Sequence, residues 1–108
     1  MAYYDFLFTY SVSPIGGDEK AVMLSDKVRK KIADIDEYKW SKLDAVETTF
    51  AGELYLTATS TDGRRDEAER TVKDVLRAVV DECEAFSDVW VKVALMLDKH
   101  GVYIEFKI

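Results

Sequence analysis

Hydrophobic and polar residues alternate strictly near the N-terminus, which predicts a first β-strand. Over residues 3–12 (YYDFLFTYSV), every second residue is apolar or aromatic, and these residues share one face: Tyr4, Phe6, Phe8, Tyr10 and Val12. A period of two with many aromatic residues is typical of a strand with one buried face. The segment SPIGG at 13–17 contains the only proline and a glycine pair, so we expect the strand to end there.

Two later segments follow the helical period instead. The first runs from Asp18, an expected N-cap, to about Ile35, and its apolar stripe is Ala21, Leu24, Val28, Ile32 and Ile35. The second covers about residues 64–86, and its stripe is Ala68, Val72, Val75, Leu76, Val79, Cys83 and Phe86. We therefore expect two amphipathic helices, each with one buried side.

Four further strands are expected around the second helix. Residues 43–50 (LDAVETTF) and 53–60 (ELYLTATS) indicate two strands joined near Ala51–Gly52, after an irregular segment at 34–42 that contains Trp40. Residues 89–97 and 102–108 indicate a C-terminal hairpin whose turn, DKHG at 98–101, ends at a glycine.

The resulting order β-α-β-β-α-β-β predicts an α+β fold in one domain, residues 1–108. Each helix has one apolar stripe and each strand has one strongly apolar face, so both helices are expected on one face of an antiparallel sheet. The ferredoxin-like sandwich satisfies this order, and the last hairpin would add a C-terminal strand to it.

Charge and length narrow the range of functions. The 108 residues carry a formal net charge of −6, which argues against a general nucleic-acid binder. No apolar run approaches the roughly 20 residues that span a bilayer, and no secretory signal is evident, so we expect a cytoplasmic protein without membrane contact. The single cysteine rules out an intramolecular disulfide and a cysteine-rich zinc site.

The sheet face away from the helices is predicted to be unusually apolar. It would present Tyr3, Leu7, Tyr55, Trp90, Met96 and Tyr103. Contiguous apolar surface of this kind marks interfaces. We therefore expect a homodimer or higher oligomer that forms through this face.

The segment DECEAFSD at 81–88 predicts a second surface, which we call the acidic pole. Antiparallel helices would bring the end of the second helix beside the start of the first and gather Glu82, Glu84, Asp88, Asp18 and Glu19. A helix C-terminus favours cations rather than acids. Asp81 is expected to pair with Arg77, while Glu82, Glu84 and Asp88 are expected to lack partners, so this pole is the predicted site for a basic partner.

No catalytic, metal or cofactor site is predicted. Cys83 lies on the apolar stripe between two glutamates, whereas nucleophilic thiols lie at helix N-termini or near positive charge, so we interpret it as a core residue. His100 falls in the hairpin turn, far from Cys83 in this arrangement. Asp81, Glu84 and Asp88 lack the spacing of a calcium loop.

One resemblance adds an alternative. The loop SVSPIGG after the first strand, followed by a helix and the strand GELYLTATS, resembles the thiamine-binding ferredoxin-like family. The resemblance covers a few residues and the topology, and it assigns no binding residue. It implies an oligomer that binds a small molecule near its subunit contacts.

Two functional hypotheses follow. The first is a small, acidic, non-enzymatic binding or regulatory protein that self-associates through its sheet face. It would bind a basic protein partner at the acidic pole, in the manner of an inhibitor. The alternative is a small-molecule-binding oligomer with a pocket at the subunit contact, lined by Tyr3, Tyr55, Trp90 and Tyr103.

Overall fold

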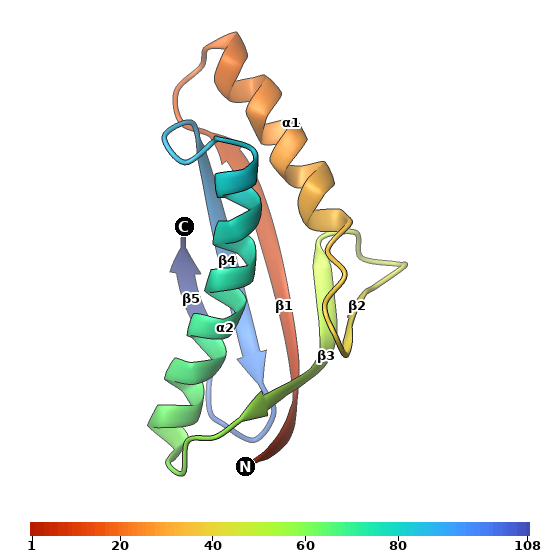
Figure 1. Cartoon of the computed structure of the whole chain (residues 1–108), viewed down its shortest axis with the longest axis vertical. Helices are drawn as coiled ribbons and strands as arrows, with labels where there is room; N and C mark the ends of the chain where they lie inside the picture. The colour runs from red at the N-terminus through yellow and green to blue at the C-terminus, as the bar shows by residue number, and fades with distance from the viewer.

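The computed structural model describes residues 1–108 as an α+β fold with two helices and a five-stranded antiparallel sheet (Figure 1). The elements in chain order are β1 (Ala2–Pro14), α1 (Glu19–Ala33), β2 (Trp40–Lys42), β3 (Thr49–Leu56), α2 (Thr61–Glu82), β4 (Val89–Leu97) and β5 (Ile104–Lys107). The predicted fold class, with two helices and five strands, is confirmed.

The sheet is built around the long first strand. Its order is β2-β3-β1-β4-β5, and all neighbouring strands are antiparallel. The register aligns Phe8 of β1 with Phe50 of β3 and Leu95 of β4. Neighbouring buried side chains therefore form continuous rows across the three central strands.

One hydrophobic core contains the apolar stripes of both helices and one side of the sheet. Along β1 the buried residues alternate with exposed ones, as the sequence predicts. Phe8 is fully buried, and its ring stacks on Phe50 with centroids 5.3 Å apart and lies 5.5 Å from Trp40. These contacts join β1, β2 and β3 into one aromatic cluster.

Both helices begin at a capped N-terminus and run in opposite directions (Figure 1). Asp18 accepts a 2.7 Å hydrogen bond from the Ala21 N–H, which confirms the predicted cap of α1. Ser60 caps α2 in the same way by accepting from the Gly63 N–H. Neither helix is both long enough and apolar enough to cross a membrane.

The prediction for the first hairpin is wrong. Residues 43–48 form the connection rather than a strand, and Ala51–Gly52 lie inside β3 rather than at a turn. The short β2 falls within the segment that was expected to be irregular. It forms because Trp40 packs against Phe6, Phe8 and Phe50. A three-residue strand that is fixed by one tryptophan has no periodic pattern of its own.

Gly52 makes the close pairing of β2 with β3 sterically possible. A Cβ at this position would overlap the carbonyl oxygen of Lys39 and would lie 3.1 Å from the Cα of Trp40. The same Lys39 oxygen accepts a 3.1 Å hydrogen bond from the Glu53 N–H. The glycine therefore permits close backbone approach rather than a turn.

The end of α2 also differs from the prediction. The helix ends at Glu82, and Glu84 adopts a left-handed conformation with φ 54°. The Ala85 N–H then bonds back to the Val80 carbonyl, so Ala85 enters the core. Phe86, predicted to lie on the buried stripe, is 63% exposed as a result.

The C-terminal hairpin is held to α2 by an arginine. The guanidinium of Arg65 donates to the carbonyls of His100, at 2.7 Å, and Val102, at 2.6 Å. Pairing of β5 with β4 begins only at Ile104, two residues after the predicted start of the strand, and Val102 is 72% exposed.

Glu67 of α2 holds the connection between β3 and α2 in place through hydrogen bonds. Its carboxylate accepts hydrogen bonds from the N–H groups of Thr57 and Ala58 and from the Thr57 hydroxyl, at 2.9–3.1 Å. These bonds, above all the one from Ala58, hold the pKa of Glu67 below its usual value of 4.5. The ionised carboxylate is therefore the form that the fold favours.

Replacing Glu67 by glutamine is expected to cost about 1 kcal/mol at neutral pH, because a charged acceptor of several bonds becomes neutral. The pKa is lower in the folded chain, so this contribution is present above pH 4.5 and is lost as the pH falls through the folded-state pKa. Urea unfolding between about pH 3 and 7 measures it. Glu47→Gln, in the 43–48 connection, is the control; if it changes the pH dependence as much as Glu67→Gln does, the effect does not come from this contact.

Candidate functional site

One side of the sheet is exposed, and we call it the open face. Its side chains alternate with the buried ones along β1, β4 and β5, and along β3 from Ala51 onward, since Thr49 and Phe50 are both buried. The members are Tyr3, Asp5, Leu7, Thr9 and Ser11 on β1; Ala51, Glu53 and Tyr55 on β3; Trp90, Lys92, Ala94 and Met96 on β4; and Glu105 and Lys107 on β5.

Most of the predicted apolar residues of this face are indeed exposed. Tyr3, Leu7, Tyr55, Met96 and Tyr103 have exposed fractions between 40% and 56%. Leu7 and Met96 are directly opposite each other in the β1–β4 register, near the middle of the open face. Tyr103 lies just before β5, outside the paired strands. The Asp5–Glu53 row separates Tyr3 and Tyr55 from Leu7 and Met96.

The tyrosines at one end of the open face form a cluster with a lysine. The rings of Tyr3 and Tyr55 meet edge to face with centroids 5.2 Å apart. Lys39 Nζ lies 5.1 Å from the Tyr3 ring and 5.4 Å from the Tyr38 ring, and 3.8 Å from a carboxylate oxygen of Glu53. A cation above these rings makes the end of the face amphipathic rather than purely apolar.

Trp90 differs from the other predicted face residues because it is half-buried. The ammonium of Lys107 lies 4.1 Å from its ring centroid and covers part of it. Trp90 is therefore less available to a partner than Leu7 or Met96.

Most charges on the open face lie in two rows, and Glu105, opposite Ala94, lies between them. Asp5 is opposite Glu53 on β3, and on the other side its carbonyl accepts the N–H of Asp98, the residue directly after β4. At the far end Lys92 is opposite Lys107. Like charges directly opposite each other destabilise a sheet, and the ion pair of Glu53 with Lys39 offsets this only in the acidic row.

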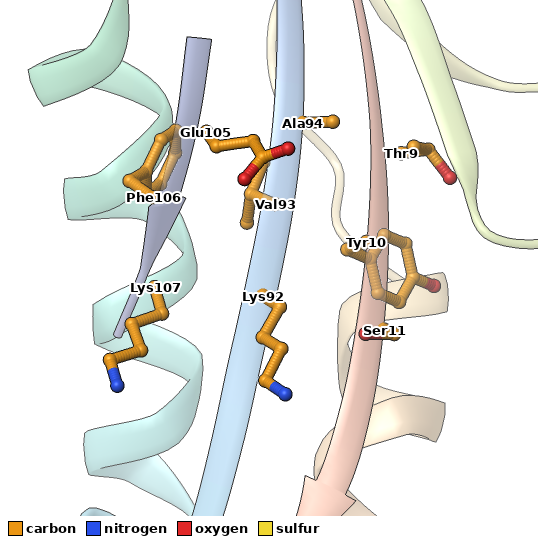
Figure 2. Close-up of a pocket in the computed structure, with 9 residues that line it drawn as sticks. All are labelled: Thr9, Tyr10, Ser11, Lys92, Val93, Ala94, Glu105, Phe106 and Lys107. Carbon is orange, nitrogen blue, oxygen red and sulfur yellow. The ribbon is translucent and has the colours of Figure 1, made fainter.

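A shallow groove of about 540 Å³ follows the basic row (Figure 2). Figure 2 shows Lys92 and Lys107 extending from neighbouring strands toward the lower end of the view, where they diverge, with Glu105 two residues before Lys107 on β5. Lys92 forms no ion pair within the chain. The groove thus has a lysine without an ion pair in its lining, directly opposite Ser11 in the β1–β4 register, whereas the Thr9 hydroxyl donates to the Thr48 carbonyl.

The acidic pole is more neutralised than the sequence predicts. Glu82 pairs with Lys31 at 2.9 Å, and Asp88 is 3.9 Å from Lys20, so the expectation that these two acids lack partners is wrong. Asp18 is occupied as the cap of α1. Only Glu19 and Glu84 of the five predicted residues accept no bond from a side chain or a helix end.

The Lys31–Glu82 contact also shifts both pKa values. The hydrogen bond and the charge of Lys31 lower the pKa of Glu82, and the same contact raises the pKa of Lys31. Asp81, predicted to pair with Arg77, forms no ion pair. Lys31 is in the last turn of α1, whereas Asp18 caps its first turn, so Glu82 lies toward the opposite end of α1 from Asp18 and Glu19. The prediction that all five acids gather at one pole is therefore wrong, and only Asp88 pairs near the start of α1.

The residues with reactive side chains are buried and separate. Cys83 lies in the core at the end of α2, as predicted. His100 is at the hairpin turn as expected but is also buried, with its ring edge-to-face on Tyr4 and Nδ1 2.6 Å from the Asp98 carbonyl. No group of three or more His, Cys, Asp or Glu side chains is placed to hold a metal ion.

Comparisons with protein-family models, with curated proteins and with solved structures found no match for this chain.

Proposed function

We propose that this chain is a small non-enzymatic binding protein that works through protein–protein contacts and self-associates through the open face of its sheet. The observation that carries the proposal is the exposed apolar centre of that face, where Leu7 and Met96 stand side by side. Contiguous exposed apolar surface is unfavourable in water and is characteristic of interfaces.

The ferredoxin-like arrangement, with both helices on one face and β5 as an added strand, is part of this proposal. The strand order supports it, because β1 pairs with both β3 and β4 while β2 and β5 are the outer strands. The buried residues of α1 and α2 also belong to the same core cluster as the buried side of the sheet. In this arrangement nothing within the chain covers the open face.

A second copy is the occupant that the composition of the open face favours. Both an acidic and a basic row lie on it, with apolar residues between them. A surface that contains both signs of charge can complement another copy of itself. An apolar centre within a polar rim is also the usual anatomy of a protein interface.

The acidic pole has a smaller part in the proposed function. Its ion pairs to Lys20 and Lys31 reduce the charge available to a basic partner. Contact there would rest on Glu84 and Glu19 together with the exposed ring of Phe86. This pole is the proposed site for a basic protein partner of the assembled oligomer.

A small-molecule-binding oligomer is the second candidate, and the groove along the basic row favours it. Its volume of about 540 Å³ falls within the range of ligand pockets. Lys92 and Lys107 would select an anionic ligand, and a second copy over the open face would close the groove. Inorganic phosphate or pyrophosphate, titrated by calorimetry, is the probe for this candidate.

Met96→Glu is expected to weaken self-association by about tenfold or more, because it places a carboxylate in the apolar centre of the contact. Sedimentation velocity over a range of protein concentrations measures the change. The matched control is Met23→Glu, which makes the same substitution at an exposed position of α1. Far-UV circular dichroism checks that both variants are folded.

Two results would contradict the proposed function. One is a wild-type chain that stays monomeric at every concentration tested, up to the millimolar range. The other is an equal loss of association in the Met96 and Met23 variants, which would place the contact elsewhere than the open face.

A further inference from the structure

We infer that the two copies stack open face to open face with their strands reversed, so that Lys92 of each copy faces Asp98 of the other. This inference rests on the proposed function, because it specifies the arrangement of the copies at the same surface. The evidence is the order of charges along β1 and β4.

The charges lie in two rows that cross the strands. One row contains Asp5 and Asp98, which adjoin through the hydrogen bond from the Asp98 N–H to the Asp5 carbonyl. The other contains Ser11, Lys92 and Lys107, which the registers align. The rows are six residues apart on β1, or roughly 20 Å at about 3.3 Å per residue.

Within the chain only Glu53 of the acidic row has a cationic partner, Lys39 at 3.8 Å. Asp5, Asp98 and Lys92 form no ion pair, and Lys107 lies over the Trp90 ring. In the isolated chain each row therefore contains like charges side by side. A partner that brings the opposite sign to each row relieves both repulsions at once.

A symmetric face-to-face pair has only two main choices of axis. A two-fold axis parallel to the strands would place each row over the same row of the second copy, with acid on acid and lysine on lysine. A two-fold axis across the strands exchanges the rows and places acid over lysine twice, because the contact is reciprocal. The charge pattern selects the second axis.

The apolar residues fit the same axis. This axis passes between the cross-strand row that contains Leu7 and the one that contains Thr9, midway between the two charged rows. Leu7 then lies over Thr9 of the second copy, and Met96 lies over Ala94. Sheets that pack face to face are about 10 Å apart with strands inclined by about 30°, so these side chains fill the centre while the charges lie toward the ends.

Reversing one charge is the first arm of the test. Lys92→Glu and Asp98→Lys, each alone, are expected to weaken the homodimer by about tenfold or more, since each creates two like-charge contacts. The matched controls are Arg77→Glu and Asp74→Lys, which make equivalent charge changes on the exposed side of α2. Lys92→Glu also converts the like-charged pair with Lys107 into an opposite pair, so the fold is expected to be retained.

Mixing the two single variants is the decisive arm. In the mixed pair, the glutamate introduced at position 92 of one chain meets the lysine introduced at position 98 of the other, and the unchanged Asp98 meets the unchanged Lys92. Both contacts are then complementary again. We expect native mass spectrometry to show a heterodimer in the mixture and little of either homodimer. The double variant, Lys92→Glu with Asp98→Lys in one chain, is expected to recover homodimer affinity to within about threefold of wild type, because both contacts again join opposite charges.

The outcomes separate this inference from the proposed function. If wild type does not dimerise, the proposed function fails and the inference fails with it. If wild type dimerises and Met96→Glu weakens it, while the charge variants match their controls or fail to form the heterodimer, only the reversed stacking is overturned. Loss of the dimer on adding inorganic phosphate, with calorimetric binding at Lys92, would favour an anionic ligand in the groove and would also overturn it.

Discussion

Replacing Phe8 by alanine is expected to destabilise the fold by about 3–5 kcal/mol. The side chain is fully buried, and its ring contacts those of Phe6, Tyr10, Trp40 and Phe50. Removing it leaves a cavity where β1, β2 and β3 meet the core. Small domains have a total stability of about 5–15 kcal/mol, so the variant would lose a large share of its stability and unfold at a much lower urea concentration.

Urea unfolding followed by tryptophan fluorescence measures this loss, since Trp40 lies in the same cluster. The matched control is Phe86→Ala, which removes the same side chain from an exposed turn. Its expected cost is within about 0.5 kcal/mol. Equal destabilisation by the two substitutions would contradict the assignment of Phe8 to the core and Phe86 to the surface.

Gly52→Ala is expected to cost about 1–3 kcal/mol or more, although it adds a single methyl group. The added Cβ would overlap the Lys39 carbonyl oxygen, which is backbone and cannot rotate away as a side chain can. Relief requires β2 to move off β3, and that movement breaks the Glu53–Lys39 hydrogen bond and separates Trp40 from Phe50.

Thermal unfolding and Trp40 fluorescence both report on this substitution. The control is Gly17→Ala, because a Cβ at Gly17 meets no atom within 4 Å. That variant is expected to be neutral or slightly stabilised. A Gly52→Ala chain with wild-type melting temperature and emission would show that β2 does not pair with β3 at this distance.

The elements that were predictable from the sequence are those whose burial repeats over many residues. Residues 3–12 and 89–97 alternate long enough to define strands, and both helices have continuous apolar stripes. The short β2 was not predictable, because one tryptophan and one glycine fix it, and neither makes a period. Phe86 fits the helical stripe, but the chain turns at Glu84, a residue type that gives no signal for a left-handed conformation.

Some features of the candidate site were also predictable from the sequence, and others were not. Exposure of Tyr3, Leu7 and Met96 follows from strand alternation once one face is known to be buried. The pairing of Glu82 with Lys31 could not be predicted, because the two residues are 51 positions apart and meet only through the packing of α1 beside α2. The two rows of charge on the open face likewise depend on register, which a single sequence does not define.

The short outermost strands limit how further chains can extend the sheet. β2 has three residues and β5 has four, so each of these strands offers few backbone groups to a neighbouring strand. Each also ends in a lysine, Lys42 or Lys107, whose charge opposes pairing with another strand. Hydrogen-bonded extension from these two strands to another chain is therefore disfavoured. In the proposed homodimer the contact lies on the broad side of the sheet instead, where a two-fold pair is closed and adds no third member.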